Sequence, residues 1–322
     1  MYRFRPTKVV IFIIFLIMII LFLLSVKRKN SMVHHQYPDS GKLKEVLRAA
    51  TMSTRTVILT IIEKTWARNG SIVDLFLQSY KNGENTKHLL NHVVIVTLDV
   101  QSLIYCETIH PHCFYLQTSA ILYDGIGSHS FSSLNYPIID HIRNQLLLRV
   151  LHLGYNALYT EADVMWLRNP FPLFHPESEV TIGCDSSSGN GKVTSGGFFY
   201  TRASAISIDF IVLWNLIKLL YPDANNKTVC EMALYEDFKG IGLYIRFIDP
   251  QYYGGFCETN KDISNIYTMH ANCCDDLDNK IHDLNLFLDH SKYKGLMGKV
   301  TNLDLLSAAA GKSPMRCFST YI

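Results

Sequence analysis

Short apolar runs alternate with stretches of helical periodicity over most of the chain. Runs of strand length occur at residues 57–62, 92–98, 156–160, 179–183, 198–201, 243–248 and 266–270. Apolar side chains recur on one helical face at residues 71–80, 137–153 and 204–220. Continuous apolar runs are typical of strands buried on both faces, as in a parallel sheet covered by helices. The pattern predicts one α/β domain over residues 54–322 with a mostly parallel sheet flanked by helices.

A separate apolar segment lies near the N-terminus. Residues 9–26 are apolar apart from Ser25, and a helix of this length spans about 27 Å, enough to cross a thin bilayer. The run ends in three basic residues instead of a small-residue cleavage site, which is typical of a retained anchor. We therefore expect a cytosolic tail over residues 1–8, a single transmembrane anchor over residues 9–26 and a polar stem over residues 27–53.

The distribution of charge argues against nucleic acid as a partner. The chain carries 30 basic and 28 acidic residues, and six of the basic ones flank the anchor. The remainder therefore has 24 basic against 28 acidic residues, a net charge of −4. A domain that binds nucleic acid usually carries the opposite sign.

Cysteines and glycosylation sequons favour a luminal position for the large domain. The basic residues are balanced across the anchor, three on each side, so they do not set its orientation. The chain has eight cysteines, many for a cytosolic enzyme, and the sequons at Asn69 and Asn226 are candidate glycosylation sites. Five cysteines in local groupings are disulfide candidates: Cys106, Cys113, Cys257, Cys273 and Cys274. The alternative is that these cysteines are free thiols buried in the core.

Two carboxylates follow the strand expected at residues 156–160. Ligands of open α/β sheets bind beyond the carboxyl ends of the strands, so Glu161 and Asp163 stand where chemistry is expected. On an extended chain, side chains two residues apart point the same way, and both carboxylates could face one cation. Such hard oxygen ligands suit Mg²⁺ or Mn²⁺. The alternative is an exposed loop or a helix cap, which is where acidic pairs at strand ends are more often found.

Five strings in the chain resemble those of a known enzyme family. The strings are YTEADVMWLRNPF at residues 159–171, LDVQSLIYCETIHPHCF at 98–114, SGGFFY at 195–200, YYGGFCETNKD at 252–262 and TMHANCC at 268–274. Together they resemble the nucleotide-diphospho-sugar transferases of glycosyltransferase family 77, known largely from plant cell-wall biosynthesis, over about residues 56–288. The resemblance implies a Rossmann-type GT-A fold and transfer of a sugar from a nucleotide-diphospho-sugar to a glycan or glycoprotein, with retention of anomeric configuration.

The resemblance also implies where the protein works. It suggests a type II topology in the Golgi membrane, with the catalytic domain in the lumen. Complexes with other glycosyltransferases are a further kind of partner that it suggests. The sugar is left open, because galactose, xylose and arabinose are all compatible with the family.

The resemblance assigns the metal site residue by residue. Asp163 matches the second acid of the family's D-x-D motif, which ligates the cation, and Glu161 stands where the family usually has Asp. Glu161 keeps the charge and could touch the nucleotide ribose or a metal-bound water. His270 matches a late histidine that completes the metal site, and imidazole favours Mn²⁺ over Mg²⁺. Lys280 matches a lysine that contacts the diphosphate; otherwise it is a solvated lysine on a helix.

Further residues are candidates for binding the nucleotide sugar. Gly196 and Gly197 permit close approach of the backbone to a sugar, or form a simple tight turn. Asp99 stands where the family places part of the nucleotide pocket. Arg143 could reach a phosphate or make a surface ion pair. Trp166 and Phe171 are expected to pack in the core.

One departure from the family bears on activity. Members commonly carry an Asp-Gln pair that contacts substrate, and the corresponding positions here are Glu231 and Met232. A thioether lacks the hydrogen bonds of an amide. A catalytically silent protein that binds nucleotide sugar or glycan as a scaffold is therefore the alternative function. No catalytic nucleophile is assigned, and the absence of a second cluster of His and Asp argues against a metallohydrolase.

Overall fold

The fold is known from a computed structural model. It describes residues 39–117, 136–186, 193–220, 242–249, 251–256, 265–272, 274, 276–292 and 316–317. The expected cytosolic tail, anchor and first part of the stem lie outside these residues, as do Asn226, Glu231, Met232, Cys257 and Cys273. Within the described part of the chain, no helix has the length and apolar character needed to span a membrane.

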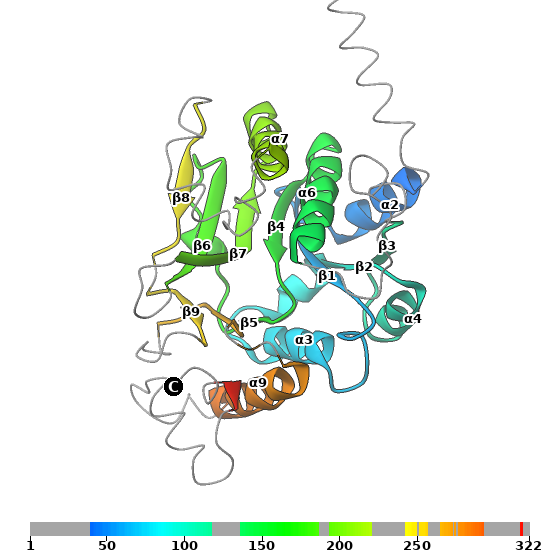
Figure 1. Cartoon of the computed structure of the whole chain (residues 1–322), viewed down its shortest axis with the longest axis vertical. Coiled ribbons are helices and arrows are strands. Elements are labelled where there is room, and N and C mark those ends of the chain that lie inside the picture. The colour runs from blue at the N-terminus through cyan, green and yellow to red at the C-terminus, as the bar shows by residue number, and fades with distance from the viewer. Residues whose placement is uncertain are drawn as a thin grey trace, which may run out of the picture.

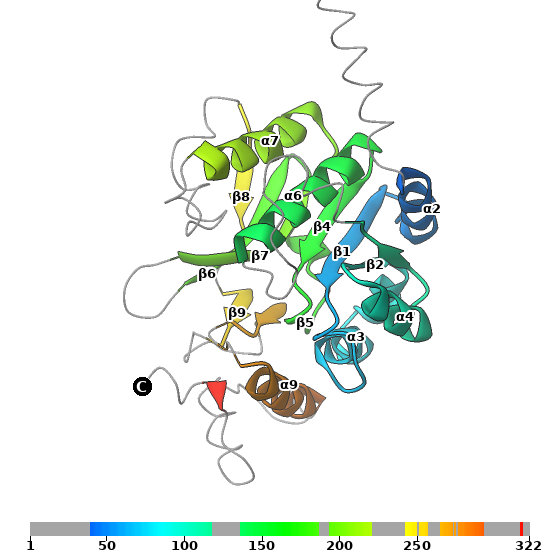
Figure 2. The same ribbon diagram turned by 45° about the vertical axis from the view of Figure 1, so that its right-hand side comes forward.

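A seven-stranded sheet forms the centre of the molecule, and its strand order is β3-β2-β1-β4-β7-β6-β8 (Figure 1); Figure 2 shows the sheet from another side. The strands are β1 (Thr56–Ile62), β2 (Val93–Thr97), β3 (Cys113–Tyr115), β4 (Asn156–Thr160), β6 (Val180–Ser186), β7 (Val193–Thr201) and β8 (Ile245–Phe247). Neighbouring strands run parallel except that β7 is antiparallel to both β4 and β6. The expected α/β fold with a mostly parallel sheet is confirmed.

The central strands are mostly apolar because helices and loops cover both faces of the sheet. All seven residues of β1 are buried. Ile58 and Ile62 join one apolar cluster, and Val57 and Leu59 join a second cluster on the other face. Strand side chains alternate between faces, so a strand buried on both sides is apolar at most positions on each face, and in β1 the exceptions are the buried threonines Thr56 and Thr60.

Two groups of helices supply these two clusters. The first cluster includes side chains of α3 (Ile72–Asn82), α4 (Val100–Ile109) and α9 (Leu277–Lys292). The second includes α2 (Ser40–Ala50), α6 (Tyr136–His152) and α7 (Ala205–Leu220). Figure 1 shows α6 beside α7 and α3 beside α9, and residues of each pair are in contact. Short 3₁₀ helices cover Lys87–His92 and Phe171–Leu173.

Helix α2 extends the folded domain into the region expected to be a stem. Leu43, Leu47 and Ala50 are buried on one face of α2 and pack with side chains of β2 and β3. Their spacing of three and four residues places them on the same side of the helix. The Nδ1 atom of His92 lies 2.8 Å from the carbonyl oxygen of Ala50, at the end of α2. Residues 40–50 therefore belong to the domain, which begins before the expected boundary at residue 54.

A second sheet has three strands in the order β5-β10-β9. They are β5 (Val164–Trp166), β9 (Tyr253–Gly255) and β10 (Thr268–His270). Strand β10 runs antiparallel to β5 and parallel to β9. Because β5 follows β4 after only a short turn, this sheet brings residues near 165 together with residues near 270.

Among the described residues, two disulfides connect segments of the domain. Cys106 in α4 bonds to Cys113 in β3, with Cα atoms 6.0 Å apart. The segment between the two cysteines includes the end of α4. Cys274 bonds to Cys317, a partner that was not among the expected cysteines. A hydrogen bond also fixes Cys317, because its backbone N–H donates to the buried carboxylate of Asp283 at 2.8 Å.

The packing of α2 gives a prediction about stability. Leu47→Ala leaves a cavity at a fully buried position, and we expect it to lower the free energy of unfolding by about 3 kcal/mol. Chemical denaturation of the full chain, followed by circular dichroism, measures this change. Lys44→Ala, at an exposed position of the same helix, is the control and should have little effect. Equal stability of both variants would mean that α2 is a stem that does not pack on the domain.

Candidate metal centre

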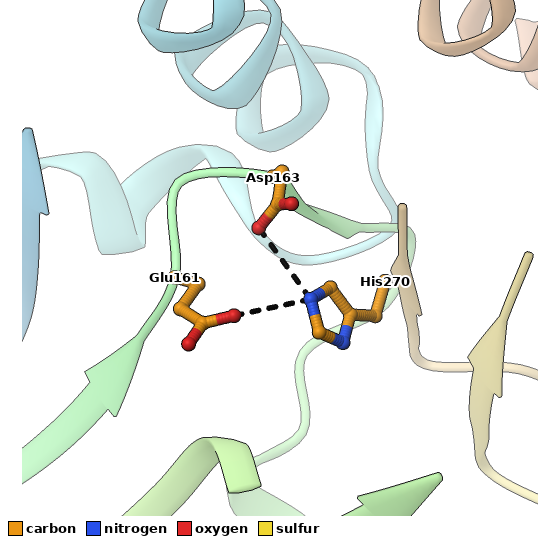
Figure 3. A group of neighbouring side chains, drawn as sticks. All are labelled: Glu161, Asp163 and His270. Carbon is orange, nitrogen blue, oxygen red and sulfur yellow. Dashed lines mark ion pairs between the residues drawn. The ribbon is translucent and has the colours of Figure 1, made fainter. Parts of the chain in front are cut away.

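Three side chains from two segments far apart in the sequence converge beyond the carboxyl end of β4. Glu161 and Asp163 lie in the connection from β4 to β5, and His270 ends β10 (Figure 3). The Nε2 atom of His270 lies 3.1 Å from Glu161 Oε2 and 3.5 Å from Asp163 Oδ1. One ligand atom from each residue falls within 4.8 Å of the others, the grouping that a single metal ion requires.

Backbone hydrogen bonds hold the connection that carries the two acids. The N–H of Glu161 donates to the carbonyl of Gly197 at 2.8 Å, and the N–H of Val164 donates to the carbonyl of Glu161 at 3.1 Å. The second bond closes a tight turn, so the backbone from Glu161 to Asp163 is not extended as expected. The carboxylates converge because the chain turns back toward β10. There the N–H of Ala271 donates to the carbonyl of Asp163 at 3.0 Å.

The chemistry of the cluster fits a divalent cation. Asp163 Oδ1 is buried and accepts no hydrogen bond from the residues that the structure describes. A buried carboxylate oxygen without a donor is costly unless a ligand or ion satisfies it. Two carboxylates and one imidazole are a donor set that suits Mn²⁺ and related ions. The site can be reached from solvent through Glu161, whose side chain is 20% exposed.

Gly197 leaves the space in which the Glu161 carboxylate lies. A Cβ atom at Gly197 would stand 2.6 Å from Glu161 Oε2 and 3.3 Å from His270 Cε1. Any side chain there would push the carboxylate out of position. Gly197 therefore leaves room for Glu161, and the expected close approach of a sugar at this position stays a prediction. Gly196 precedes it in β7.

Lys280 also belongs to this site. Its Nζ lies 2.6 Å from Asp163 Oδ2, and α9 carries it in from the far side of the cluster. Burial acts to raise the pKa of Asp163, but the positive charges of Lys280 and His270 outweigh that effect and hold the pKa well below its usual range. Asp163 is therefore ionised, as a metal ligand must be.

Comparison with known proteins identifies the family. Residues 88–284 match the model of the family described as nucleotide-diphospho-sugar transferase. The chain belongs to this family. An Arabidopsis thaliana relative, the uncharacterized protein At4g15970, is 37% identical over 261 residues, which cover 79% of this chain and 68% of the relative.

Two other likenesses extend the comparison. The arabinosyltransferase RRA2 of Arabidopsis thaliana is 25% identical over 150 residues, which cover 38% of this chain and 33% of that protein. The solved structure of mouse xyloside xylosyltransferase 1 in its apo form has a TM-score of 0.41 and 10% identity, covering 68% of this chain and 98% of that one. That likeness is too slight to carry any part of the argument.

Asp99 has a capping role in the transferase. Its carboxylate accepts hydrogen bonds from the backbone N–H of Ser102 at 2.8 Å and from the Ser102 hydroxyl at 2.5 Å. It also accepts one from the backbone N–H of Lys64 at 2.8 Å. The cap starts α4 at the end of β2 and ties it to the loop after β1. The expected place of Asp99 in the nucleotide pocket stays a prediction.

Arg143 lies inside the domain instead of at a phosphate or on the surface. It pairs with Asp140 at 2.8 Å, and both side chains are buried. Its guanidinium lies 4.7 Å from the ring centre of Trp214 and 5.4 Å from that of Tyr159. Both rings belong to the second apolar cluster, between the sheet and the helices α6 and α7. Arg143 therefore stabilises packing in the core.

Two aromatic side chains near the motif have distinct positions. Trp166 is fully buried and stacks on Tyr80 with ring centres 4.5 Å apart, as expected of a core residue. Phe171 is partly buried and packs against the first apolar cluster, to which Trp166 belongs.

Trp66, in the loop after β1, was not among the residues expected at the site. Its ring centre lies 5.6 Å from Lys280 Nζ, and no motif around Trp66 signals that contact.

The space at Gly197 gives a prediction about metal binding. In Gly197→Ala, the new methyl group displaces the Glu161 carboxylate, and we expect Mn²⁺ to bind about tenfold more weakly. The end of a flexible side chain can move, so the fold should survive. Titration of Mn²⁺ by isothermal calorimetry measures the affinity, and Gly41→Ala, where a Cβ atom meets nothing within 4 Å, is the control. Unchanged affinity in Gly197→Ala would remove Glu161 from the ligand set.

Proposed function

We propose that the protein is an active, Mn²⁺-dependent transferase that moves a sugar from a nucleoside diphosphate to a hydroxyl group of a glycan or glycoprotein. The observation that carries this proposal is the convergence of Glu161, Asp163 and His270, with Lys280 beside Asp163. Family membership supports the reaction class, and the donor set supports the ion. The substitution of Glu for the usual first acid leaves the cluster intact, because Glu161 reaches His270 across the space at Gly197.

The residues present define what the site can do. Glu161, Asp163 and His270 would hold the cation, and Lys280 would add a positive charge for the diphosphate. A bound divalent cation supplies charge neutralisation for a leaving diphosphate. In the transfer, the bond from the anomeric carbon to the diphosphate oxygen breaks, and a bond to the acceptor oxygen forms. We propose retention by front-face displacement, with the hydroxyl proton passing to the departing phosphate. No described side chain is assigned as a nucleophile.

We further propose a pentose as the transferred sugar. The similarity to the arabinosyltransferase RRA2 supports this choice over a hexose. A nucleotide-activated arabinose or xylose would then be the donor, and galactose would be the hexose to compare with it.

A panel of donors tests the function. The full-length chain with Mn²⁺ and UDP-arabinose, UDP-xylose or UDP-galactose should release UDP with one of the pentose donors. Asp163→Asn removes a ligand charge and should lower the rate a hundredfold or more, because the cation is worth several kcal/mol and each factor of ten is about 1.4 kcal/mol. Asp278→Asn, an 82% exposed carboxylate on α9, is the control.

The outcomes of this assay separate the proposals. Release of UDP only from UDP-galactose would contradict the pentose while keeping the transferase. Binding of Mn²⁺ and UDP without release from any donor would favour the catalytically silent scaffold. Full activity of Asp163→Asn would contradict the metal site.

We also propose that the protein is a type II protein of the Golgi membrane with a luminal catalytic domain. The apolar run at residues 9–26 supports an anchor, and the bonds Cys106–Cys113 and Cys274–Cys317 are typical of an oxidising compartment. In sealed microsomes, a tag after Ile322 should be protected from added protease until detergent is present. Digestion of the tag without detergent would contradict this topology.

A further inference from the structure

The ammonium group of Lys280 contacts the carboxylate that we assign to the cation. Its Nζ lies 2.6 Å from Asp163 Oδ2, whereas Asp163 Oδ1 faces His270. The Asp163 side chain is 4% exposed and that of Lys280 is 14% exposed. Asp163 therefore offers one oxygen to the metal cluster while the other is already paired with a positive charge.

A divalent cation bound at Oδ1 would lie close to this ammonium group. The cation and the ammonium group of Lys280 would repel each other, because both are positively charged. The repulsion grows as water is excluded and the effective dielectric constant falls. Lys280 must then oppose binding of the cation alone. The same repulsion favours any position of the lysine that is farther from the cation or nearer to new negative charge.

The lysine has both the reach and the surroundings for such a move. An ammonium group is a point charge on a flexible four-carbon stem with three donors, so it can change partners without a change in the backbone. The backbone of Lys280 is fixed in the first turn of α9, where its N–H donates to the carbonyl of Asp276 at 3.0 Å. Trp66, a half-buried side chain, lines one side of the ammonium group at 5.6 Å.

We infer that Lys280 serves as an internal counter-ion for Asp163 and passes to the diphosphate when cation and donor bind together. The inference rests on the proposed function and adds an energetic coupling between the two binding events. Without nucleotide, Lys280 neutralises Asp163 and keeps the affinity for the cation low. With nucleotide, the negative diphosphate draws Lys280 away, and Asp163 becomes a full ligand. The two ligands therefore raise each other's affinity by the same factor.

The test compares Mn²⁺ binding with and without UDP in the full-length chain in detergent. The electron paramagnetic resonance signal of free Mn²⁺ reports binding without any need for turnover. Lys280→Met keeps the length of the side chain and removes its charge. We expect this variant to bind Mn²⁺ alone about tenfold more tightly than the natural protein, and UDP to strengthen its Mn²⁺ binding about tenfold less.

Two further variants show whether the charge is responsible. Lys280→Arg keeps the charge and should keep the weak binding of Mn²⁺ alone. Lys87→Met removes an exposed lysine on the 3₁₀ helix Lys87–His92 and should behave as the natural protein does. A lysine that merely orients Asp163 would give the opposite result, because its loss would weaken binding of Mn²⁺ both with and without UDP.

The outcomes distinguish this inference from the proposed function. Binding of Mn²⁺ by the natural protein, with unchanged or weaker binding by Lys280→Met, overturns the exchange and leaves the metal site in place. Failure of every variant and of the natural protein to bind Mn²⁺, even with UDP, overturns the metal site and the exchange together.

Discussion

The carboxylates of Glu161 and Asp163 lie close together with little access to water, so they repel each other. The surrounding structure must offset that repulsion. Asp163 is almost fully buried, and Glu161 lies against the same histidine. Without a cation, Lys280 and His270 supply the balancing positive charge, and they keep the pKa of Asp163 well below its usual range even though burial acts to raise it. Asp163 is thus held in the ionised form that a divalent ion requires of a carboxylate ligand.

The fold brings these groups together through backbone pairing. Strand β4 of the seven-stranded sheet ends just before Glu161. A tight turn then leads into β5, which pairs with β10 in the three-stranded sheet. Because Val164 pairs with His270, the histidine lies opposite the residue that follows Asp163. Gly197, on the neighbouring strand β7, leaves the space for Glu161. Each ligand therefore lies in a strand or in the short turn between two strands, and binding of a cation needs little rearrangement of the backbone.

The sequence predicts most of the long elements and the metal cluster, because both leave local signals, but the 16-residue helix α9 was not among the expected helices. Buried strands such as β1 are continuous apolar runs, and two acids directly after a strand mark its carboxyl end. The three-residue strands β5 and β9 are too short to show a period, so the second sheet could not be predicted. Helix α2 was assigned to a stem because its exposed positions are polar, although Leu43 and Leu47 already have helical spacing.

Other errors come from contacts that spacing does not encode. The bond between Cys274 and Cys317 joins residues 43 apart, and connectivity cannot be deduced from the positions of cysteines. Arg143 carries a charge and was expected at a phosphate or on the surface, but three aromatic rings surround it in the core. Gly197 was expected to allow the close approach of a sugar, which stays a prediction, and the contact with the Glu161 side chain that the structure shows there was not foreseen.

The central claim is that Glu161, Asp163 and His270 bind one divalent cation. Crystals of the protein grown with Mn²⁺ and UDP, measured at the manganese absorption edge, test it most directly. The account predicts one anomalous peak in contact with Asp163 Oδ1 and His270 Nε2, with Glu161 on the same ion or on one of its waters. A peak elsewhere, or none at this cluster while UDP is bound, would contradict it.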